Sequence, residues 1–134
     1  MSVIRIPVAL YEQVVSHALR DAPDECCGLL ELDPATGTVV AAFPAANVAA
    51  SPFRFELGPA DVLRIPQIED RGRTPVIYHS HTRSDPVPSQ TDLNFAANWP
   101  GVPWLIVGTA SDSPDVRCFD ISAGQVDTWA VELA

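Results

Sequence analysis

The run from residue 75 to residue 97 constrains the fold most, because three kinds of local structure follow one another within it. Val76-Ile77-Tyr78 is β-branched and aromatic, which predicts a strand that begins at Pro75. The loop from 84 to 88 contains two prolines and cannot be helical. Ser89 then opens a polar-to-apolar run, which predicts a short helix with Ser89 near its N-cap.

Two histidines stand at the end of this strand, and an aspartate lies in the first turn of the helix. Residues i and i+2 of a strand share a face, so His79 and His81 are expected to point the same way. The helix brings Asp92 back towards them. Imidazole nitrogens and a carboxylate oxygen are ligands that a catalytic zinc takes, with a fourth position open for water. The alternative is structural, since a lone His-x-His is often incidental and Ser89 with Asp92 also fits a capping box.

The rest of the chain predicts further strands and helices around this run. Apolar residues recur at helical spacing over 7–21, with His17 on the polar, solvated face. A second helix, opened by Gly58-Pro59, is expected to kink or split at Pro66. Further strands are expected at 3–6, 25–32, 38–43, 53–57, 102–108, 116–121 and 125–131. We therefore predict a single α/β domain over residues 1–134, with a curved, mostly antiparallel sheet and about three helices.

Length and charge exclude several classes of protein. A chain of 134 residues can bury about two-thirds of the surface that its unfolded form exposes. Eight Lys+Arg stand against 17 Asp+Glu, and this acidity disfavours nucleic acid as a partner. No apolar run approaches the roughly 18 to 20 residues of a membrane span, and the N-terminal residues show no basic region followed by an apolar one. We therefore expect a cytoplasmic protein with no membrane partner.

The cysteines and two charged residues each allow two interpretations. Cys26, Cys27 and Cys118 are odd in number and lack Cys-x-x-Cys spacing, so buried free thiols fit better than disulfides or a zinc site. Glu25 leads into an apolar strand, where a carboxylate is either held by partners or functional. Arg54 is either a partner for a substrate carboxylate or an exposed strand residue.

Taken together, these residues resemble a known family of metalloproteases. Glu25 ahead of Cys27-Gly28, then His79-Ser80-His81, Ser89 and Asp92, is similar to the JAMM (MPN+) signature with every position filled. The resemblance extends over nearly the whole chain. Three runs resemble the small actinobacterial Mec-type peptidases more closely, namely Asp24-Glu25 with Cys27-Gly28, residues 78–82 and residues 88–92. Those enzymes release cysteine from the C-terminus of a ubiquitin-like sulfur-carrier protein.

The resemblance implies a JAB/MPN domain of the cytidine-deaminase-like superfold. It implies that His79, His81 and Asp92 hold Zn²⁺. Glu25 would take the proton of the attacking water and pass it to the leaving amine, and Ser89 would donate a hydrogen bond to the oxyanion. The implied reaction is hydrolysis at the Gly-Gly tail of a sulfur-carrier protein, as a step in cysteine biosynthesis. A homodimer is compatible with the sequence, which does not identify the carrier.

Four other functions share some of these features. A deubiquitinase-like isopeptidase could act on another ubiquitin-like conjugate, but the segment between Asp92 and Trp104 is too short for the insertion with which eukaryotic relatives hold ubiquitin. Non-catalytic MPN scaffolds usually lack a ligand, and this chain lacks none. The RadC-like group is associated with DNA and carries a helix-hairpin-helix extension that is missing here. Base deamination requires His-x-Glu and Pro-Cys-x-x-Cys, and neither motif is present.

Overall fold

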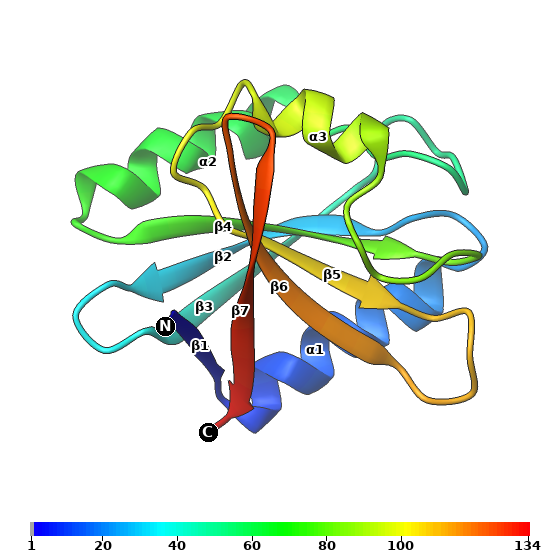
Figure 1. Cartoon of the computed structure of the whole chain (residues 1–134), viewed down its shortest axis with the longest axis horizontal. Coiled ribbons are helices and arrows are strands. Elements are labelled where there is room, and N and C mark those ends of the chain that lie inside the picture. The colour runs from blue at the N-terminus through cyan, green and yellow to red at the C-terminus, as the bar shows by residue number, and fades with distance from the viewer. Residues whose placement is uncertain (1) are drawn as a thin grey trace.

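The computed structural model describes residues 2–134 as a mixed fold of strands and helices (Figure 1). In chain order the elements are β1 (Val3–Ile6), α1 (Val8–Asp21), β2 (Cys27–Asp33), β3 (Thr38–Ala45), α2 (Pro59–Asp70), β4 (Thr74–His81), α3 (Gln90–Ala96), β5 (Trp104–Gly108), β6 (Asp115–Ser122) and β7 (Gln125–Leu133). The predicted combination of one curved sheet with three helices is confirmed. Within residues 2–134, no helix is long and apolar enough to cross a membrane.

The sheet closes into a barrel in the order β1-β3-β2-β4-β5-β6-β7. Closure depends on β1, which pairs in parallel with β7 from Val3 opposite Ala130 to Ile6 opposite Leu133. The β1–β3 and β4–β5 ladders are also parallel, and the remaining ladders are antiparallel. The first strand of the chain therefore lies beside the last one (Figure 1). Closure was not predicted, because it joins two strands from opposite ends of the sequence.

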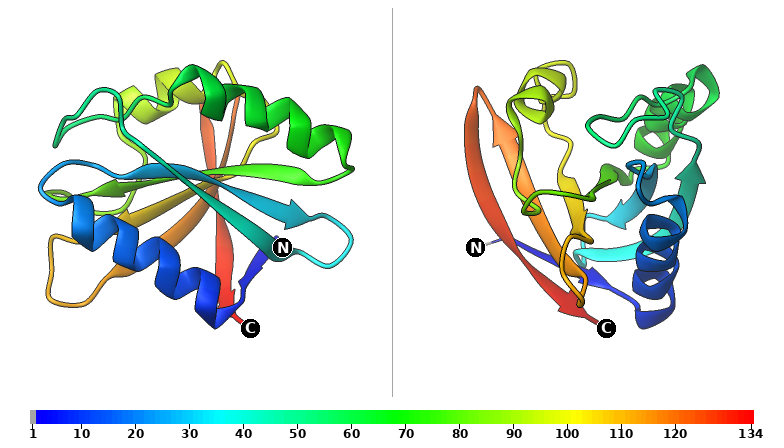
Figure 2. Two further views of the ribbon diagram at one scale, coloured as in Figure 1. Left: turned by 180° about the vertical axis from the view of Figure 1, so that it is seen from behind. Right: turned by 90° about the vertical axis from the view of Figure 1, so that its right-hand side faces the viewer.

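Strand β4 separates two hydrophobic clusters. Val76 and Tyr78 lie in the cluster that α1 covers, whereas Ile77 lies in the cluster that α2 and α3 cover. Figures 1 and 2 show α1 on one side of the barrel and α2 with α3 on the other. Because side chains alternate along a strand, His79 and His81 share the face of Ile77. The predicted ligands therefore face α3, which carries Asp92.

Two predicted elements differ in the structure. Residues 53–57 form no strand, because the side chain of Asn47 takes their backbone hydrogen bonds: its Nδ2 donates to the Arg54 carbonyl (3.0 Å) and its Oδ1 accepts the Glu56 N–H (2.9 Å). Helix α2 is not split at Pro66, which lies inside it. Pro66 is exposed, so water can satisfy the carbonyl that its missing N–H leaves free.

His17 is buried, which contradicts the prediction of a solvated residue. Its Nδ1 lies 2.7 Å from the Tyr78 hydroxyl and its Nε2 lies 3.1 Å from Asp21. Burial lowers the pKa of His17 below its ordinary value, although Asp21 acts in the opposite direction. Helical periodicity placed His17 on the polar face, but a hydroxyl from a distant strand meets it there. This network connects α1 to β4 at the residue before His79.

Gly28 leaves room for the Tyr78 ring, and this contact makes a testable prediction. The two residues pair across β2 and β4, and a Cβ on Gly28 would overlap the ring. Gly28→Ala is expected to lower the free energy of unfolding by about 3 kcal/mol, measured by urea denaturation. In a Tyr78→Leu background the same change should cost much less. An equal loss in both backgrounds would show that the ring is not the cause.

Candidate metal centre

The three predicted ligands converge at the junction of β4 and α3. His79 and His81 end β4, and Asp92 is the third residue of α3. Asp92 bridges the histidines, with Oδ1 3.4 Å from His79 Nε2 and Oδ2 3.1 Å from His81 Nε2. One ligand atom from each residue lies within 4.8 Å of the others, and all three residues are buried. The capped helix thus brings the aspartate back to the strand, as its start at Ser89 predicted.

His79 supplies an independent test of whether a metal ion fits here. Both of its ring nitrogens are buried without a hydrogen-bond partner, although carboxylate oxygens of Glu25 and Asp92 each lie 3.4 Å from one of them. Its ring is held in place by stacking on Phe55, with 4.5 Å between centroids, and by the edge of Trp104. A buried nitrogen without a partner is costly. Two imidazoles and one carboxylate therefore fit a metal ion.

His81 is oriented by the loop before α3. Its Nδ1 lies 2.8 Å from the carbonyl oxygen of Asp85, so Nδ1–H donates there and Nε2 faces Asp92. Burial acts to lower the pKa of His81, but the bonds to Asp92 and Asp85 outweigh it and raise the pKa above its ordinary value. Metal binding would displace the proton from Nε2. In the same loop, Pro86 packs on Gly108. A Cβ added to Gly108 would lie 2.9 Å from the Pro86 ring.

Ser89 and Asp92 form the predicted capping box. The Ser89 Oγ accepts the Asp92 N–H (3.1 Å), and the Ser89 N–H donates to Asp92 Oδ2 (2.9 Å). Burial acts to raise the pKa of Asp92, but its bonds to His81 and Ser89 and the nearby His79 lower the pKa below the ordinary value. The cap uses only a lone pair of the Ser89 hydroxyl. Its hydrogen stays available for another acceptor.

Glu25 reaches the site from the segment before β2, the strand that pairs with β4. Its carboxylate is buried, with Oε1 3.4 Å from His79 Nδ1. Its backbone is clamped, because its N–H donates to the Ser51 carbonyl (2.9 Å) and its carbonyl accepts from Asn47 Nδ2 (3.0 Å). The next residue, Cys26, donates its N–H to the buried Ser80 hydroxyl (2.8 Å). Strand β2 begins only at Cys27, so Glu25 stands in the connection before it.

Sequence reasoning missed the supporting roles of Asn47, Ser80, Asp85 and Gly108. The only signal for Ser80 was its place between the histidines, where a strand residue points to the other face. Asp85 acts through its backbone, which no side-chain pattern reveals. The predicted free thiols are confirmed: Cys26, Cys27 and Cys118 are buried and unpaired, and burial raises the pKa of each to about 12.

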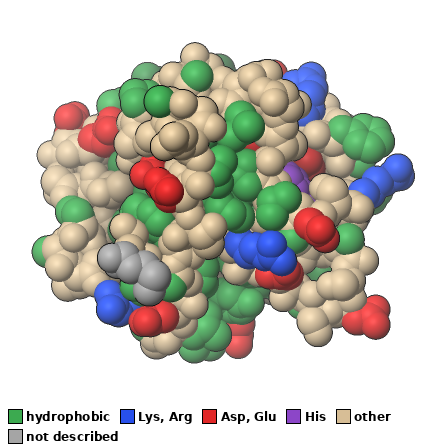
Figure 3. Space-filling view, viewed as in Figure 1, with side chains coloured by type: hydrophobic (Ala, Val, Ile, Leu, Met, Phe, Trp, Pro, Cys, Tyr) green, Lys and Arg blue, Asp and Glu red, His purple; other side chains and the backbone are tan. Residues whose placement is uncertain are grey.

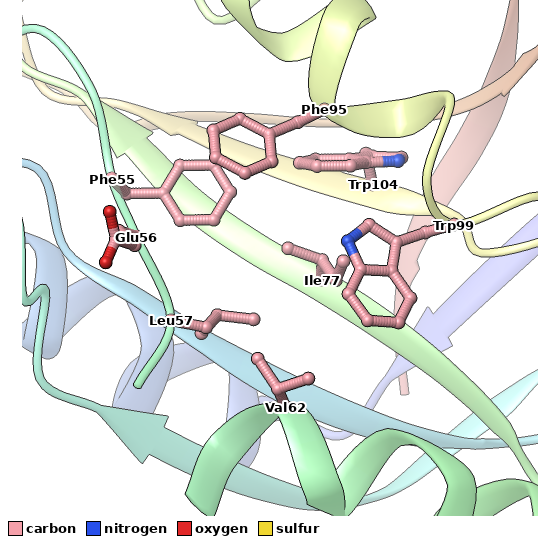
Figure 4. Close-up of a pocket in the computed structure, with 8 residues that line it drawn as sticks. All are labelled: Phe55, Glu56, Leu57, Val62, Ile77, Phe95, Trp99 and Trp104. Atoms are coloured by element: carbon pink, nitrogen blue, oxygen red, sulfur yellow. The ribbon is translucent and has the colours of Figure 1, made fainter. Parts of the chain in front are cut away.

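A cleft of about 240 Å³ opens onto this site. The residues that line it are Glu25, Pro52, Phe53, His81, Thr82, Arg83, Ser84 and Ser89. Figure 3 shows histidine atoms at the surface on the right of this face, beside acidic atoms. An apolar cavity of about 70 Å³ lies behind Phe55, and Figure 4 shows the side chains of Ile77, Phe95 and Trp104 around it. Ser89 and Glu25 thus face open space, whereas the His79 ring is enclosed.

Comparison with known proteins agrees with this geometry. Residues 7–122 match the family described as prokaryotic homologs of the JAB domain. The chain belongs to this family. It is 44% identical over 113 residues to the desampylase of Haloferax volcanii, covering 79% of this chain and 77% of that protein. It is 35% identical over 134 residues to the CysO-cysteine peptidase of Mycobacterium tuberculosis, covering 98% and 91%.

A solved structure supports the fold of this JAB-family chain. The solution structure of protein DSY2949 from Desulfitobacterium hafniense superposes with a TM-score of 0.81 at 27% identity, covering 98% of this chain and 92% of that one. The family resemblance drawn from Glu25, the two histidines, Ser89 and Asp92 is therefore confirmed. The roles of these five residues stay predictions.

Proposed function

We propose that this JAB-family chain is a zinc metallopeptidase that hydrolyses the bond at the C-terminus of a ubiquitin-like sulfur-carrier protein and releases cysteine. The observation that carries the proposal is the buried group of His79, His81 and Asp92, with Glu25 in contact and a cleft open to it. The relative named CysO-cysteine peptidase aligns along nearly all of the chain and supports the substrate. A carrier tail ending in Gly-Gly can approach the buried group closely, because glycine has no side chain.

In this proposal His79, His81 and Asp92 hold the ion. Two nitrogens and one carboxylate oxygen favour zinc over calcium or magnesium, which prefer all-oxygen sites. Bound zinc supplies Lewis-acid chemistry and makes hydroxide available near neutral pH. The stacked Phe55 ring and the Asp85 carbonyl hold the two imidazoles in position before the metal arrives.

Glu25 transfers the proton in this reaction, and Ser89 stabilises the negative charge that develops on the carbonyl oxygen. Glu25 takes the proton from the attacking water and gives it to the leaving amine, and its clamped backbone keeps the carboxylate beside His79. Ser89 donates its free O–H to the oxyanion that forms at the scissile carbonyl. Both side chains line the same cleft, as this division of work requires.

A second candidate function is an isopeptidase that acts on another ubiquitin-like conjugate. The relative named desampylase favours it, because its identity to this chain is 44%. Both functions use the same metal centre and differ in the leaving group, which is an amino acid in one and a lysine side chain in the other. We also propose that residues 1–134 form a single JAMM/MPN domain that acts in the cytoplasm.

A direct assay distinguishes these functions. Zinc-loaded protein is incubated with a ubiquitin-like carrier that ends in Gly-Gly-Cys, and the carrier is followed by intact mass. We expect the loss of one cysteine residue, its abolition by a chelator and its recovery with added zinc. Asp92→Asn, which removes a ligand charge, should bind less zinc and lose activity. Failure to release cysteine at full zinc content, with cleavage of a lysine-linked conjugate, would favour the isopeptidase.

A further inference from the structure

Arg83 is the only arginine or lysine among the residues that line the catalytic cleft. It follows the ligand His81 by two residues and is exposed at the cleft mouth. Arg54, the arginine that the sequence suggested for a substrate carboxylate, does not line the cleft and lies 3.8 Å from Glu56 instead. The structure therefore moves the candidate carboxylate partner from Arg54 to Arg83.

Within residues 2–134, Arg83 has no acidic partner, which is unusual for an arginine of this chain. Six of the eight basic residues pair with a carboxylate, namely Arg5, Arg20, Arg54, Arg71, Arg73 and Arg117. Arg64 has none either, but it stacks on Phe43, away from the cleft lining. In a protein of net charge −9, a cation without an acidic partner at the site mouth is available for a substrate anion.

Arg83 lies over an aromatic ring. The guanidinium carbon lies 5.3 Å from the centroid of the Phe53 ring. Phe53 is 69% exposed and belongs to the loop that clamps the backbone of Glu25. Stacking on an aromatic face leaves the edge N–H groups of a guanidinium free, and that edge matches the two oxygens of a carboxylate. The contact with Phe53 thus favours an orientation in which Arg83 can bind a planar anion in the cleft that Glu25 also lines.

The two sides of Glu25 differ in charge. On one side the cleft contains Arg83, and on the other side a second hollow is lined by Asp21, Asp24 and Asn47. A carboxylate on the leaving group would be attracted to the first side and repelled from the second. In a carrier–amino acid adduct, the α-carboxylate is one carbon away from the nitrogen that Glu25 protonates. A lysine-linked conjugate has no carboxylate at that distance.

We propose that Arg83 binds the free α-carboxylate of the leaving amino acid, so that the site prefers adducts of a single amino acid over lysine-linked or amidated ones. This inference rests on the proposed peptidase function and specifies its substrate class. The reaction remains a hydrolysis: the amide C–N bond breaks, water adds OH to the carrier carbonyl carbon and H to the amine, and nothing is oxidised. Arg83 and its charge are unchanged at the end.

The test compares two substrates that differ only in this group. Carrier ending in Gly-Gly-Cys is prepared with a free carboxylate and with a C-terminal amide, and kcat/KM is measured for both. Loss of a charge-assisted hydrogen bond predicts a preference for the acid of about tenfold or more in the wild-type protein. Arg83→Gln is expected to bring this ratio to about one. Phe53→Leu should give an intermediate ratio.

Arg54→Gln is the matched control, because it removes the same charge next to Phe53 from a residue outside the cleft lining. It should keep the wild-type ratio. A wild-type ratio near one would overturn the proposal, and so would an Arg83→Gln variant that loses activity equally on both substrates. An Arg54→Gln variant with the same effect as Arg83→Gln would also overturn it. The loss of preference would then reflect the overall electrostatic potential of the protein and not a direct contact with the substrate.

A binding measurement separates this inference from the proposed function. In Glu25→Gln protein, the dissociation constants of the two adducts are measured with and without Arg83→Gln. Tighter binding of the acid that depends on Arg83 supports the carboxylate site. If zinc-loaded wild type cleaves neither adduct while this preference persists, the peptidase function fails and the site stands. Equal binding of both adducts overturns the site, whatever the turnover.

Discussion

Glu25→Gln is expected to retain zinc and to lower kcat by about a thousandfold, because a positioned general base contributes roughly a hundredfold to ten-thousandfold. The amide keeps the size of the carboxylate but cannot take a proton. The backbone clamp from Ser51 and Asn47 does not involve the side chain, so the fold should be unchanged. Zinc content by elemental analysis and turnover of the carrier–cysteine adduct check both parts.

Glu31→Gln is the control for this variant. Glu31 is a buried acid on β2 whose carboxylate pairs with Arg71 (2.6 Å) and Arg73 (3.3 Å), and it does not line the cleft. The same change there should lower stability and leave kcat unaltered. A Glu25→Gln protein with full zinc and kcat within a factor of ten of wild type would sink the assignment of Glu25 as the base.

Ser89→Ala has the second largest expected effect. It should lower kcat by about a hundredfold or more at unchanged zinc content, because an oxyanion donor is worth that much. Loss of the N-cap should also lower the free energy of unfolding by about 1 kcal/mol. Both effects are expected together, since the cap uses the lone pair of the hydroxyl and the oxyanion uses its hydrogen. Turnover, zinc content and urea denaturation measure the effects separately.

Two further variants at this position distinguish the roles. Ser89→Thr keeps an acceptor for the Asp92 N–H and a donor for the oxyanion, so it should retain most of both. Ser89→Gly lacks the hydroxyl but costs only a few tenths of a kcal/mol as a cap. It should therefore lose turnover like Ser89→Ala with little loss of stability. If kcat falls only in proportion to zinc, Ser89 is a cap alone.

Local sequence was sufficient for the elements that carry the ligands. His79 and His81 share a face because strand side chains alternate, and Asp92 returns because Ser89 caps the next helix. These relationships involve residues near one another in the chain, so short-range rules predicted them. The apolar run 102–108 was predicted as a strand for the same reason, and the structure forms it over Trp104–Gly108. Membership in the JAB family followed from the spacing of five residues.

Long-range contacts decided what the local rules missed. His17 is buried because Tyr78 meets it, and residues 53–57 avoid a strand because Asn47 takes their hydrogen bonds. Hydrophobic periodicity within one segment cannot predict a contact with a residue from a distant part of the chain. Barrel closure through β1 and β7 is the largest example.

The sequence by itself predicted the candidate ligand set and determined the helix cap and the family, because each depends on spacing within one segment or on a shared motif. Tertiary structure decided which side chains surround that set. It brought Glu25 against His79, the Phe55 ring over the same imidazole, and Arg83 with Phe53 to the cleft mouth. These contacts form only when the sheet brings the strands and loops together, which short-range preferences cannot specify.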